Sequence, residues 1–290
     1  MSFEKHILDG DKYMSLAEAE LAKADWFFNR IDKYKAIQMI IQSGDSYALG
    51  KDYAKSIKSY LAGITLISNS PKLLLDYNMC NLMLSYMEMC NKNKTTINNI
   101  VLKCLDKKMI IYLQEMKNYN IIIKIYEAIA FNYEIQNNTE TALKYYEEAS
   151  NYAEMTKMKS TTIKLINKIA ELNIVVNNKI AAFEKYKECA ELCLASDLLK
   201  IKSKVYLLYS LMVVIELLNE EQFEEKMIEY KNLCPVFSNS PEYNLIRGLF
   251  LANKTKDVEY INNVIANNYL FFDKCIISIL ENVKNSFINA

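Results

Sequence analysis

TALKYYEEASNYAE (residues 141–154) and AAFEKYKECAELCL (residues 181–194) superimpose with an offset of 40 residues. The offset matches Ala142 with Ala182, and it also matches a tyrosine and a glutamate of each stretch. Apolar and small residues recur in both stretches at the spacing of one helical face. The two stretches therefore predict one amphipathic helix that is used twice.

The same offset extends to the segments that precede these two helices. KIYEAIA, KLINKIA and KVYLLYS begin at residues 124, 164 and 204, and each has a small residue at its seventh position. Helix pairs that repeat every 40 or so residues, with small residues where neighbouring helices approach, are typical of α-solenoids. We expect an all-α fold, a right-handed α-solenoid of tetratricopeptide-like helix pairs with longer helices.

The 40-residue register ends near residue 237. We expect residues 1–236 to form the α-solenoid, with an aromatic loop near residues 26–32, and residues 237–290 to form a C-terminal helical bundle or cap. A cap is required because the last repeat of a solenoid would otherwise expose its apolar face.

Composition supports a helical protein with balanced charge. The 290 residues include only five Gly and three Pro, which leaves few positions for the tight turns of sheets. Thirty-five basic residues balance thirty-five acidic ones, so no global field favours nucleic acid. The seven Cys form no CxxC pair, which favours reduced thiols and a cytoplasmic location. No signal peptide or membrane-spanning segment is predicted.

The residues offer little for catalysis. The chain has one histidine, His6, and no glycine-rich phosphate-binding motif. Neither a Ser-His pair nor a histidine-rich metal site can be assembled from one histidine. We predict that the protein is not an enzyme and that it needs no cofactor or metal.

A set of lysines follows the repeat. Lys124, Lys164 and Lys204 occupy the same position of three successive helix pairs, so a solenoid would align them in a column. Lys168 lies one helical turn after Lys164, and Lys200 one turn before Lys204. One interpretation is that these side chains simply face water. The other is that they form a basic stripe for an elongated acidic partner.

Several segments resemble one known family. EKMIEYKNLCPVFSNSPEYNLIRGL (residues 225–249), ASDLLKIKSKVY (residues 195–206) and YYEEASNYAE are similar to segments of the soluble NSF attachment proteins, or SNAPs. Near the N-terminus, LAEAE (residues 16–20) is followed by an aromatic pair and then by residues 33–60. These segments are similar in order and spacing to the N-terminal segments of SNAPs. The resemblance covers nearly the whole chain, is diffuse between about residues 70 and 118, and favours the alpha/beta type.

The resemblance implies an adaptor for vesicle-mediated transport. SNAPs bind the four-helix SNARE complex left after membrane fusion and recruit the hexameric AAA ATPase NSF, which pulls the complex apart for further rounds of intracellular protein transport. In the family, basic residues of the concave solenoid face hold the SNARE bundle. Lys124, Lys164, Lys168 and Lys204 match those positions, and Lys200 is their neighbour. The alternative is a helical-repeat scaffold that binds another partner without stimulating NSF.

The stretch KADWFFNRIDK (residues 23–33) contains three consecutive aromatic residues. SNAPs carry a membrane-contacting loop with a Phe pair at this place, so the resemblance implies that Trp26, Phe27 and Phe28 touch the membrane surface and make the protein peripherally membrane-associated. Aromatic side chains suit the lipid interface. The second interpretation is that Trp26 and one Phe fasten the first helix to the second.

The C-terminal end departs from the family. The acidic tail with its near-terminal Leu is missing, and Asn253-Lys254-Thr255-Lys256 replaces an expected acidic cluster. Both differences fall where SNAPs engage NSF. Leu280 or Phe287 would then stand in for the missing Leu as the residues that contact NSF.

Overall fold

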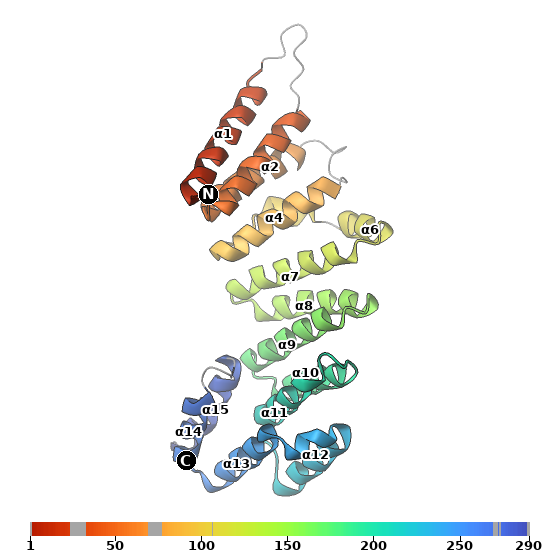
Figure 1. The fold of residues 1–290 in the computed structure, drawn as a ribbon, viewed down its shortest axis with the longest axis vertical. Coiled ribbons are helices and arrows are strands. Elements are labelled where there is room, and N and C mark those ends of the chain that lie inside the picture. Colours follow the sequence, from red (N-terminus) through yellow and green to blue (C-terminus); the bar gives the residue numbers. More distant parts are fainter. Residues whose placement is uncertain are drawn as a thin grey trace. The chain divides into compact units, whose positions relative to one another are not determined.

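The computed structural model describes residues 2–23, 33–68, 77–105, 107–268, 272 and 274–288. Within these ranges every regular element is helical, with fifteen α-helices, two short 3-10 helices and no strand (Figure 1). The predicted all-α, helical-repeat class is confirmed, while the handedness of the solenoid stays a prediction. None of the described helices combines the length and the apolarity that crossing a lipid bilayer requires.

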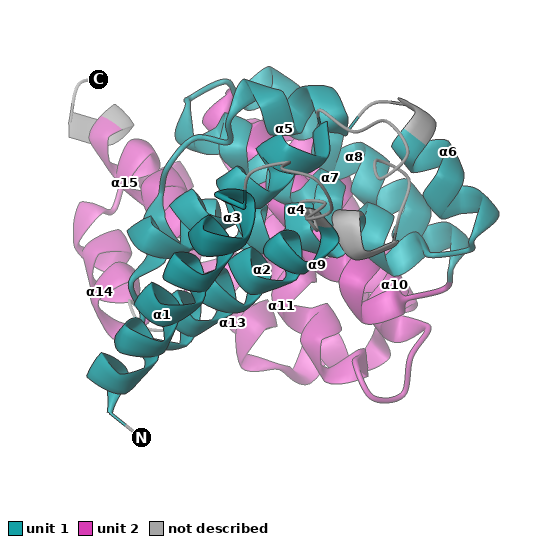
Figure 2. Ribbon diagram, turned by 90° about the horizontal axis from the view of Figure 1, so that it is seen from above, with its two compact units in different colours: residues 1–156 teal, residues 157–290 magenta. Residues whose placement is uncertain are grey.

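The chain divides into two compact units, residues 1–156 and residues 157–290 (Figure 2). The helices of the first unit are α1 (Phe3–Leu21), α2 (Lys33–Leu49), α3 (Tyr53–Ser68), α4 (Tyr77–Asn93), α5 (Asn99–Cys104), α6 (Lys107–Glu115), α7 (Tyr119–Ile135) and α8 (Thr139–Met155). Those of the second unit are α9 (Lys159–Val175), α10 (Lys179–Leu194), η1 (Lys200–Lys202), α11 (Ser203–Val214), α12 (Glu220–Leu233), η2 (Pro235–Asn239), α13 (Pro241–Thr255), α14 (Val258–Asn268) and α15 (Lys274–Ile288). The boundary expected between residues 236 and 237 lies inside the second unit, and that division stays a prediction.

Four successive helices follow one register. Helices α7, α8 and α9 have 17 residues each and α10 has 16. Their starts at residues 119, 139, 159 and 179 are evenly spaced, and three-residue connections separate them. One helix pair with its two connections therefore accounts for the 40-residue repeat in the sequence.

Two of these connections show why the helices end where they do. Asn137 and Asn177 have positive φ angles of 58° and 59°, the left-handed conformation that ends a helix and that asparagine tolerates well. The following residues, Asn138 and Asn178, each accept a hydrogen bond through Oδ1 from a backbone N–H of the next helix, at 3.2 Å. A pair of asparagines therefore terminates one helix and caps its successor.

The small residues of the repeat lie where the prediction places them. Ala130 of α7 and Ala170 of α9 are completely buried, as is Ser210 of α11. The repeated tyrosines, Tyr146 and Tyr186, are buried as well. Within each unit, small residues allow adjacent helices to approach, and the tyrosine rings fill the space beside them.

Helices α1 and α2 are held together by a polar contact that the sequence pattern did not reveal. The ring of Tyr47 lies against Gly10, where a Cβ atom would be only 2.7 Å from the ring. The Tyr47 hydroxyl donates to Asp11 Oδ1 at 2.6 Å, and Ser43 Oγ donates to the Gly10 carbonyl at 2.9 Å. Thus a Ser and a Tyr, spaced one turn apart on one helix, hydrogen-bond to an adjacent Gly and Asp on the other helix.

The same contact recurs between α2 and α3. Tyr60 donates to Asp45 Oδ1 at 2.6 Å, and Ser56 Oγ donates to the Gly44 carbonyl at 2.8 Å. A Cβ atom at Gly44 would lie 2.4 Å from Cε1 of the Tyr60 ring. These hydrogen bonds satisfy polar groups that the close approach of the helices removes from water.

In the second unit, the last helix covers an apolar surface. Helix α15 packs against α9 and α11. Its buried residues recur at helical spacing and are Ile276, Ile279, Leu280 and Val283. They join the apolar core that α11 and α13 supply, so α15 covers part of that core, while its role as a terminal cap of the solenoid stays a prediction.

We expect Gly44→Ala to destabilise the protein because the new methyl group collides with the Tyr60 ring. The expected loss of unfolding free energy is about 1 to 3 kcal/mol. Gly63→Ala is the control, since Gly63 also lies within a helix but its Cβ would be 3.3 Å from the nearest side chains. Urea unfolding followed by circular dichroism measures both variants. An equal or smaller loss in Gly44→Ala would contradict the close approach.

Candidate functional site

Two of the five predicted lysines lie on one face of α9. Lys164 is exposed and Lys168 is half-buried, while the preceding and intervening residues Ile163 and Ile166 are buried. The Lys168 ammonium lies 3.3 Å from Glu171 Oε2. The spacing of four residues places both lysines on adjacent turns, as the sequence predicted.

Two further lysines lie at the start of α11. Lys200 is exposed on η1, and its carbonyl accepts a hydrogen bond from Ser203 Oγ at 2.7 Å, which joins η1 to α11. Lys204 is the second residue of α11, and its side chain is 24% exposed. Its ammonium lies 3.9 Å from Glu242 Oε2 of α13. Lys204 therefore has a structural partner, whereas Lys200 faces solvent.

Helices α9 and α11 share a neighbour and an apolar cluster. Helix α10 packs against both. Cys189 and Cys193 of α10 lie in one cluster with Ile163 of α9, and Tyr206 of α11 packs against it. Because Ile163 adjoins Lys164 and Tyr206 follows Lys204 by two residues, this cluster fixes the helices that carry the four lysines of the second unit.

Lys124 belongs to the first unit. It is exposed on α7 and lines a hollow of about 320 Å³, together with Glu88, Asn91 and Phe131. The lining of this hollow combines side chains of both charges with apolar side chains. The alignment of Lys124 with the lysines of the second unit in one column stays a prediction.

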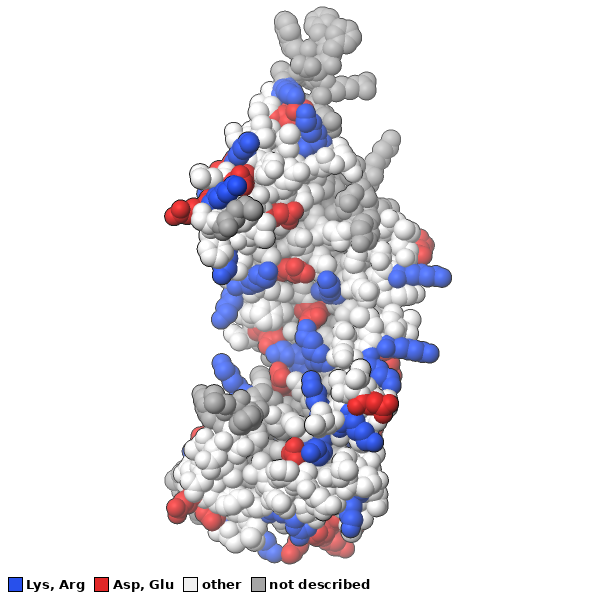
Figure 3. Space-filling view, viewed as in Figure 1, with Lys and Arg blue, Asp and Glu red and all other residues white. Residues whose placement is uncertain are grey.

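Not every lysine of the repeat is available to a partner. Lys187 of α10 donates to Glu229 Oε1 of α12 at 2.6 Å, and Lys226 lies 2.8 Å from the other oxygen of the same carboxylate. The hydrogen bond to Glu229 raises the pKa of Lys187. On the face drawn in Figure 3, acidic side chains lie among the basic ones. A basic surface here depends on which lysines remain exposed rather than on net charge.

The remaining predicted residues lie at the two ends of the chain. Trp26, Phe27 and Phe28 are outside the described residues. Leu280 is 1% exposed and belongs to the core of the second unit, so its side chain holds α15 in place. Phe287 lies near the C-terminal end of α15.

Five of the cysteines in the described structure are buried, and Cys104 and Cys275 are partly buried. Cys189 and Cys193 lie one helical turn apart in α10 and are completely buried. Burial raises the pKa of both thiols, so they are protonated at neutral pH. Among the described residues, no group of three or more His, Cys, Asp or Glu side chains is placed to hold a metal ion.

Sequence reasoning missed a row of five tyrosines between α7 and α8. The rings of Tyr133 and Tyr145 stack with centroids 5.6 Å apart and planes 4° apart, and Tyr126 lies 6.0 Å from Tyr145. Tyr152 continues the row, 5.9 Å from Tyr126 and 6.3 Å from Tyr119. The spacing of seven residues on each helix was the available signal.

Comparison with known proteins places the chain in one family. The family model described as soluble NSF attachment protein, SNAP, matches residues 8–288. The chain is 24% identical to the probable vesicular-fusion protein sec17 homolog of Neurospora crassa, with all of this chain and 98% of the relative covered. It is 24% identical to the alpha-soluble NSF attachment protein of Homo sapiens, over 84% of this chain and 83% of the relative. The alpha-soluble NSF attachment protein of Vitis vinifera is 21% identical over 87% of this chain and 84% of that protein.

A helical-repeat chain with exposed lysines on successive helix pairs has the architecture of an adaptor that holds other proteins. The match over nearly the whole chain then decides the family: this chain belongs to the soluble NSF attachment proteins.

Proposed function

We propose that the chain is the adaptor that binds assembled SNARE complexes and recruits NSF for their disassembly, in vesicle fusion and intracellular protein transport. The observation that supports this function most is the family match over residues 8–288, which includes both units and the C-terminal helix. The described structure supports it further, because the helices that carry the lysines of α9, η1 and α11 lie in one unit and pack against α10. Their charge fits the acidic surface of a SNARE bundle.

Contacts between exposed charges are individually weak, about 1 kcal/mol or less each. Affinity for the SNARE bundle therefore comes from several lysines that act together, and added salt reduces it. Lys164 and Lys200 are the best residues to alter because both are exposed. Reversal of Lys204 would also place a second carboxylate beside Glu242 and disturb the packing of α13 on α11.

We expect Lys164→Glu/Lys200→Glu to weaken binding to a purified SNARE complex by about tenfold or more, since two attractive contacts become repulsive. Lys231→Glu/Lys274→Glu changes the net charge equally at two exposed positions outside the predicted set and is the control. Sedimentation or pull-down with soluble SNARE complex at two salt concentrations measures the effect. Equal binding by the two double variants, both of them folded, would show that Lys164 of α9 and Lys200 of η1 do not contact the SNARE complex.

The membrane contact is part of the same proposal. Trp26, Phe27 and Phe28 insert at the lipid interface and keep the cytoplasmic adaptor beside membrane-anchored SNAREs. Phe27→Ser/Phe28→Ser is then expected to reduce disassembly on liposomes several-fold and to spare soluble complexes, because the apolar contribution to membrane binding is lost. Disassembly with purified NSF and ATP in both formats measures the difference. An equal loss in both formats, with a lower melting temperature, would instead support attachment of the first helix to the second.

The contact with NSF is proposed at the C-terminal end of α15. Leu280 supports this end from the core, and Phe287 is the contacting residue. We expect Phe287→Ser to lower NSF-dependent disassembly while SNARE binding stays unchanged. Leu280→Ala is expected to cost about 2 to 5 kcal/mol of stability, as truncation of a buried leucine does. Normal disassembly by a folded Phe287→Ser variant would rule out this contact.

The rival function is a helical-repeat scaffold that binds another partner and leaves NSF unaffected. The internal stretch Asn253-Lys254-Thr255-Lys256, which stands where the family resemblance leads us to expect an acidic cluster, is the specific observation in its favour. It predicts that the ATPase rate of NSF is the same with and without this chain, whereas an adaptor raises it. SNAP family proteins are adaptors rather than enzymes, and the proposed function requires no chemistry from this chain.

A further inference from the structure

Lys204 of α11 is held loosely by an acid of a neighbouring helix. Its ammonium lies 3.9 Å from Oε2 of Glu242 in α13, and both residues belong to the second unit. This distance allows an ion pair but is too long for a hydrogen bond. Lys187 differs, because it donates to Glu229 Oε1 at 2.6 Å and this hydrogen bond raises its pKa. Charge attraction alone therefore holds Lys204, whereas Lys187 is committed to the fold.

Glu242 is fixed in place by the start of α13. It is the second residue of that helix, after Pro241, and Ser240 Oγ caps the helix by accepting a hydrogen bond from the backbone N–H of Tyr243 at 3.3 Å. The positive end of the helix dipole attracts a carboxylate at this position. Glu242 is thus held at this end of α13 by more than its attraction to Lys204.

One oxygen of Glu242 lacks a hydrogen bond. Oε2, the oxygen nearest to Lys204, is buried and accepts no hydrogen bond within the described residues. A buried carboxylate oxygen without a donor is costly, and the whole side chain is only 22% exposed, which limits the access of water. The positive charge of Lys204 offsets part of this cost. Glu242 consequently draws the Lys204 ammonium toward α13.

On the basis of the proposed adaptor function, we propose that Glu242 is a positioning residue that competes with the SNARE complex for Lys204. In the free chain Glu242 keeps the ammonium beside α13. When the complex binds, one of its acidic side chains takes the ammonium over. The incoming carboxylate accepts a hydrogen bond that Glu242 does not, and hydrogen bonds to charged groups are about twice as strong as neutral ones. The exchange therefore favours the partner, but it leaves the buried oxygen of Glu242 without its cation.

This competition lowers the affinity for the SNARE complex and makes it more selective. A partner gains from Lys204 only when its carboxylate comes close enough to form a hydrogen bond, because attraction from a distance is screened and does not displace Glu242. Lys200, four residues earlier, is exposed and attracts any acidic surface. The two lysines thus have different tasks, since Lys200 contributes general attraction and Lys204 tests for close contact.

The other explanation is that the ion pair only fastens α13 to α11. The two helices pack against each other and share one apolar core, to which α13 contributes Ile246 and Leu249 and α11 contributes Leu207 and Leu211. A loose ion pair adds little to such packing. Removal of the Glu242 charge is therefore expected to leave the fold intact, so that its effect on binding can be measured.

The test compares variants of the full chain in a titration with purified soluble SNARE complex at low salt. Glu242→Gln keeps the size of the side chain and removes its charge, and Glu242→Ala is a second variant judged by the same outcomes. Glu224→Gln is the matched control, because it removes one charge from an ion pair with Arg247 of α13 that contains none of the predicted lysines. Lys204→Gln, alone and combined with Glu242→Gln, completes a double-mutant cycle.

We expect Glu242→Gln to bind the SNARE complex about two- to fivefold more tightly than the unaltered chain, because Lys204 no longer has a competing acid. Glu224→Gln is expected to bind as the unaltered chain does. In the Lys204→Gln background, Glu242→Gln is expected to have no effect. Equal or weaker binding by folded Glu242→Gln, an equal gain in Glu224→Gln, or a gain that persists without Lys204 would overturn the proposal.

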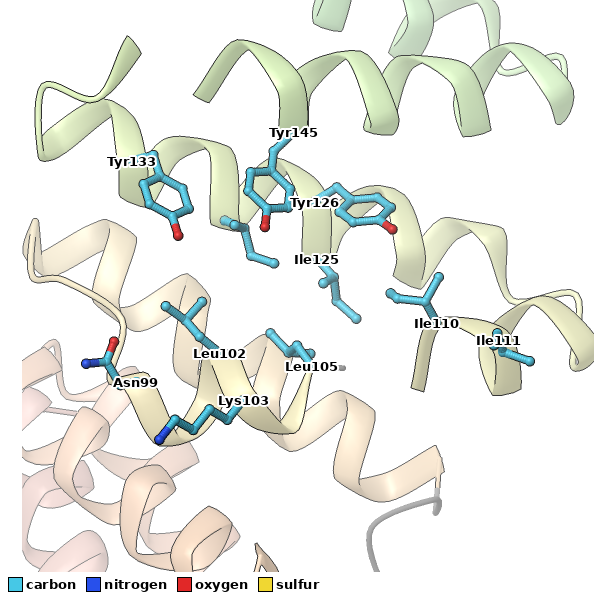
Figure 4. A pocket seen from close by; sticks show the side chains of 11 residues that line it. Asn99, Leu102, Lys103, Leu105, Ile110, Ile111, Ile125, Tyr126, Tyr133 and Tyr145 are labelled. Atoms are coloured by element: carbon cyan, nitrogen blue, oxygen red, sulfur yellow. The ribbon is translucent and has the colours of Figure 1, made fainter. Parts of the chain in front are cut away.

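A second measurement needs no SNARE complex. Acetic anhydride acetylates lysine amines, and mass spectrometry gives the rate at Lys204 relative to Lys103, which is exposed with its amine directed away from the neighbouring tyrosine rings (Figure 4). We expect this relative rate to rise about twofold or more in Glu242→Gln and to stay the same in Glu224→Gln, because the ion pair no longer holds the amine. An unchanged rate in Glu242→Gln would overturn the proposal.

The two measurements separate a failure of this proposal from a failure of the adaptor function. SNARE binding by the unaltered chain without a gain in Glu242→Gln would overturn the competition and leave the adaptor function in place. If the unaltered chain binds no SNARE complex, the adaptor function fails and the competition fails with it, even where faster acetylation supports the restraint of Lys204 by Glu242.

Discussion

The three-residue connection between helices is the constraint on which the rest of this structure depends. A left-handed residue such as Asn137 ends one helix, and the next residue caps the following helix. The left-handed conformation costs a residue other than glycine about 1 kcal/mol, and the cap returns a similar amount. The net cost is small, but the result is a fixed interval of 20 residues between helix starts. Equivalent positions of successive helix pairs can then carry the same side chain for the same purpose.

Because equivalent positions recur at this interval, a protein with no net charge can still carry basic side chains at repeated surface positions. Basic and acidic residues are equal in number, and several lysines are engaged inside the fold, as Lys187 is by Glu229. Lys124 and Lys164 are exposed at equivalent positions of α7 and α9, and they recur because the helices recur. Exposed lysines attract an acidic partner only at short range, and each contact is weak. This suits an adaptor that must release the separated SNARE proteins after disassembly.

The sequence predicted the features that depend on periodicity. The repeat, its all-helical class and the burial of Ala130 and Ala170 follow from local patterns that each helix carries by itself. The contacts of Tyr47 and Tyr60 with glycines were not predictable, because they join residues on different helices whose approach depends on packing.

For the candidate site as well, some features could be predicted from the sequence and others could not. The sequence predicted five lysines, and the structure shows that one of them, Lys204, lies beside Glu242 of another helix, α13. That contact is invisible in the sequence, because the two residues belong to different helices and to different parts of the repeat.

The most direct test of the adaptor function is the disassembly of a purified SNARE complex by NSF and ATP, with and without this chain, at low and at high salt. We expect disassembly that requires the chain and declines as salt rises, because exposed lysines hold the complex. A SNARE complex that stays intact in the presence of folded chain, NSF and ATP at low salt would contradict it.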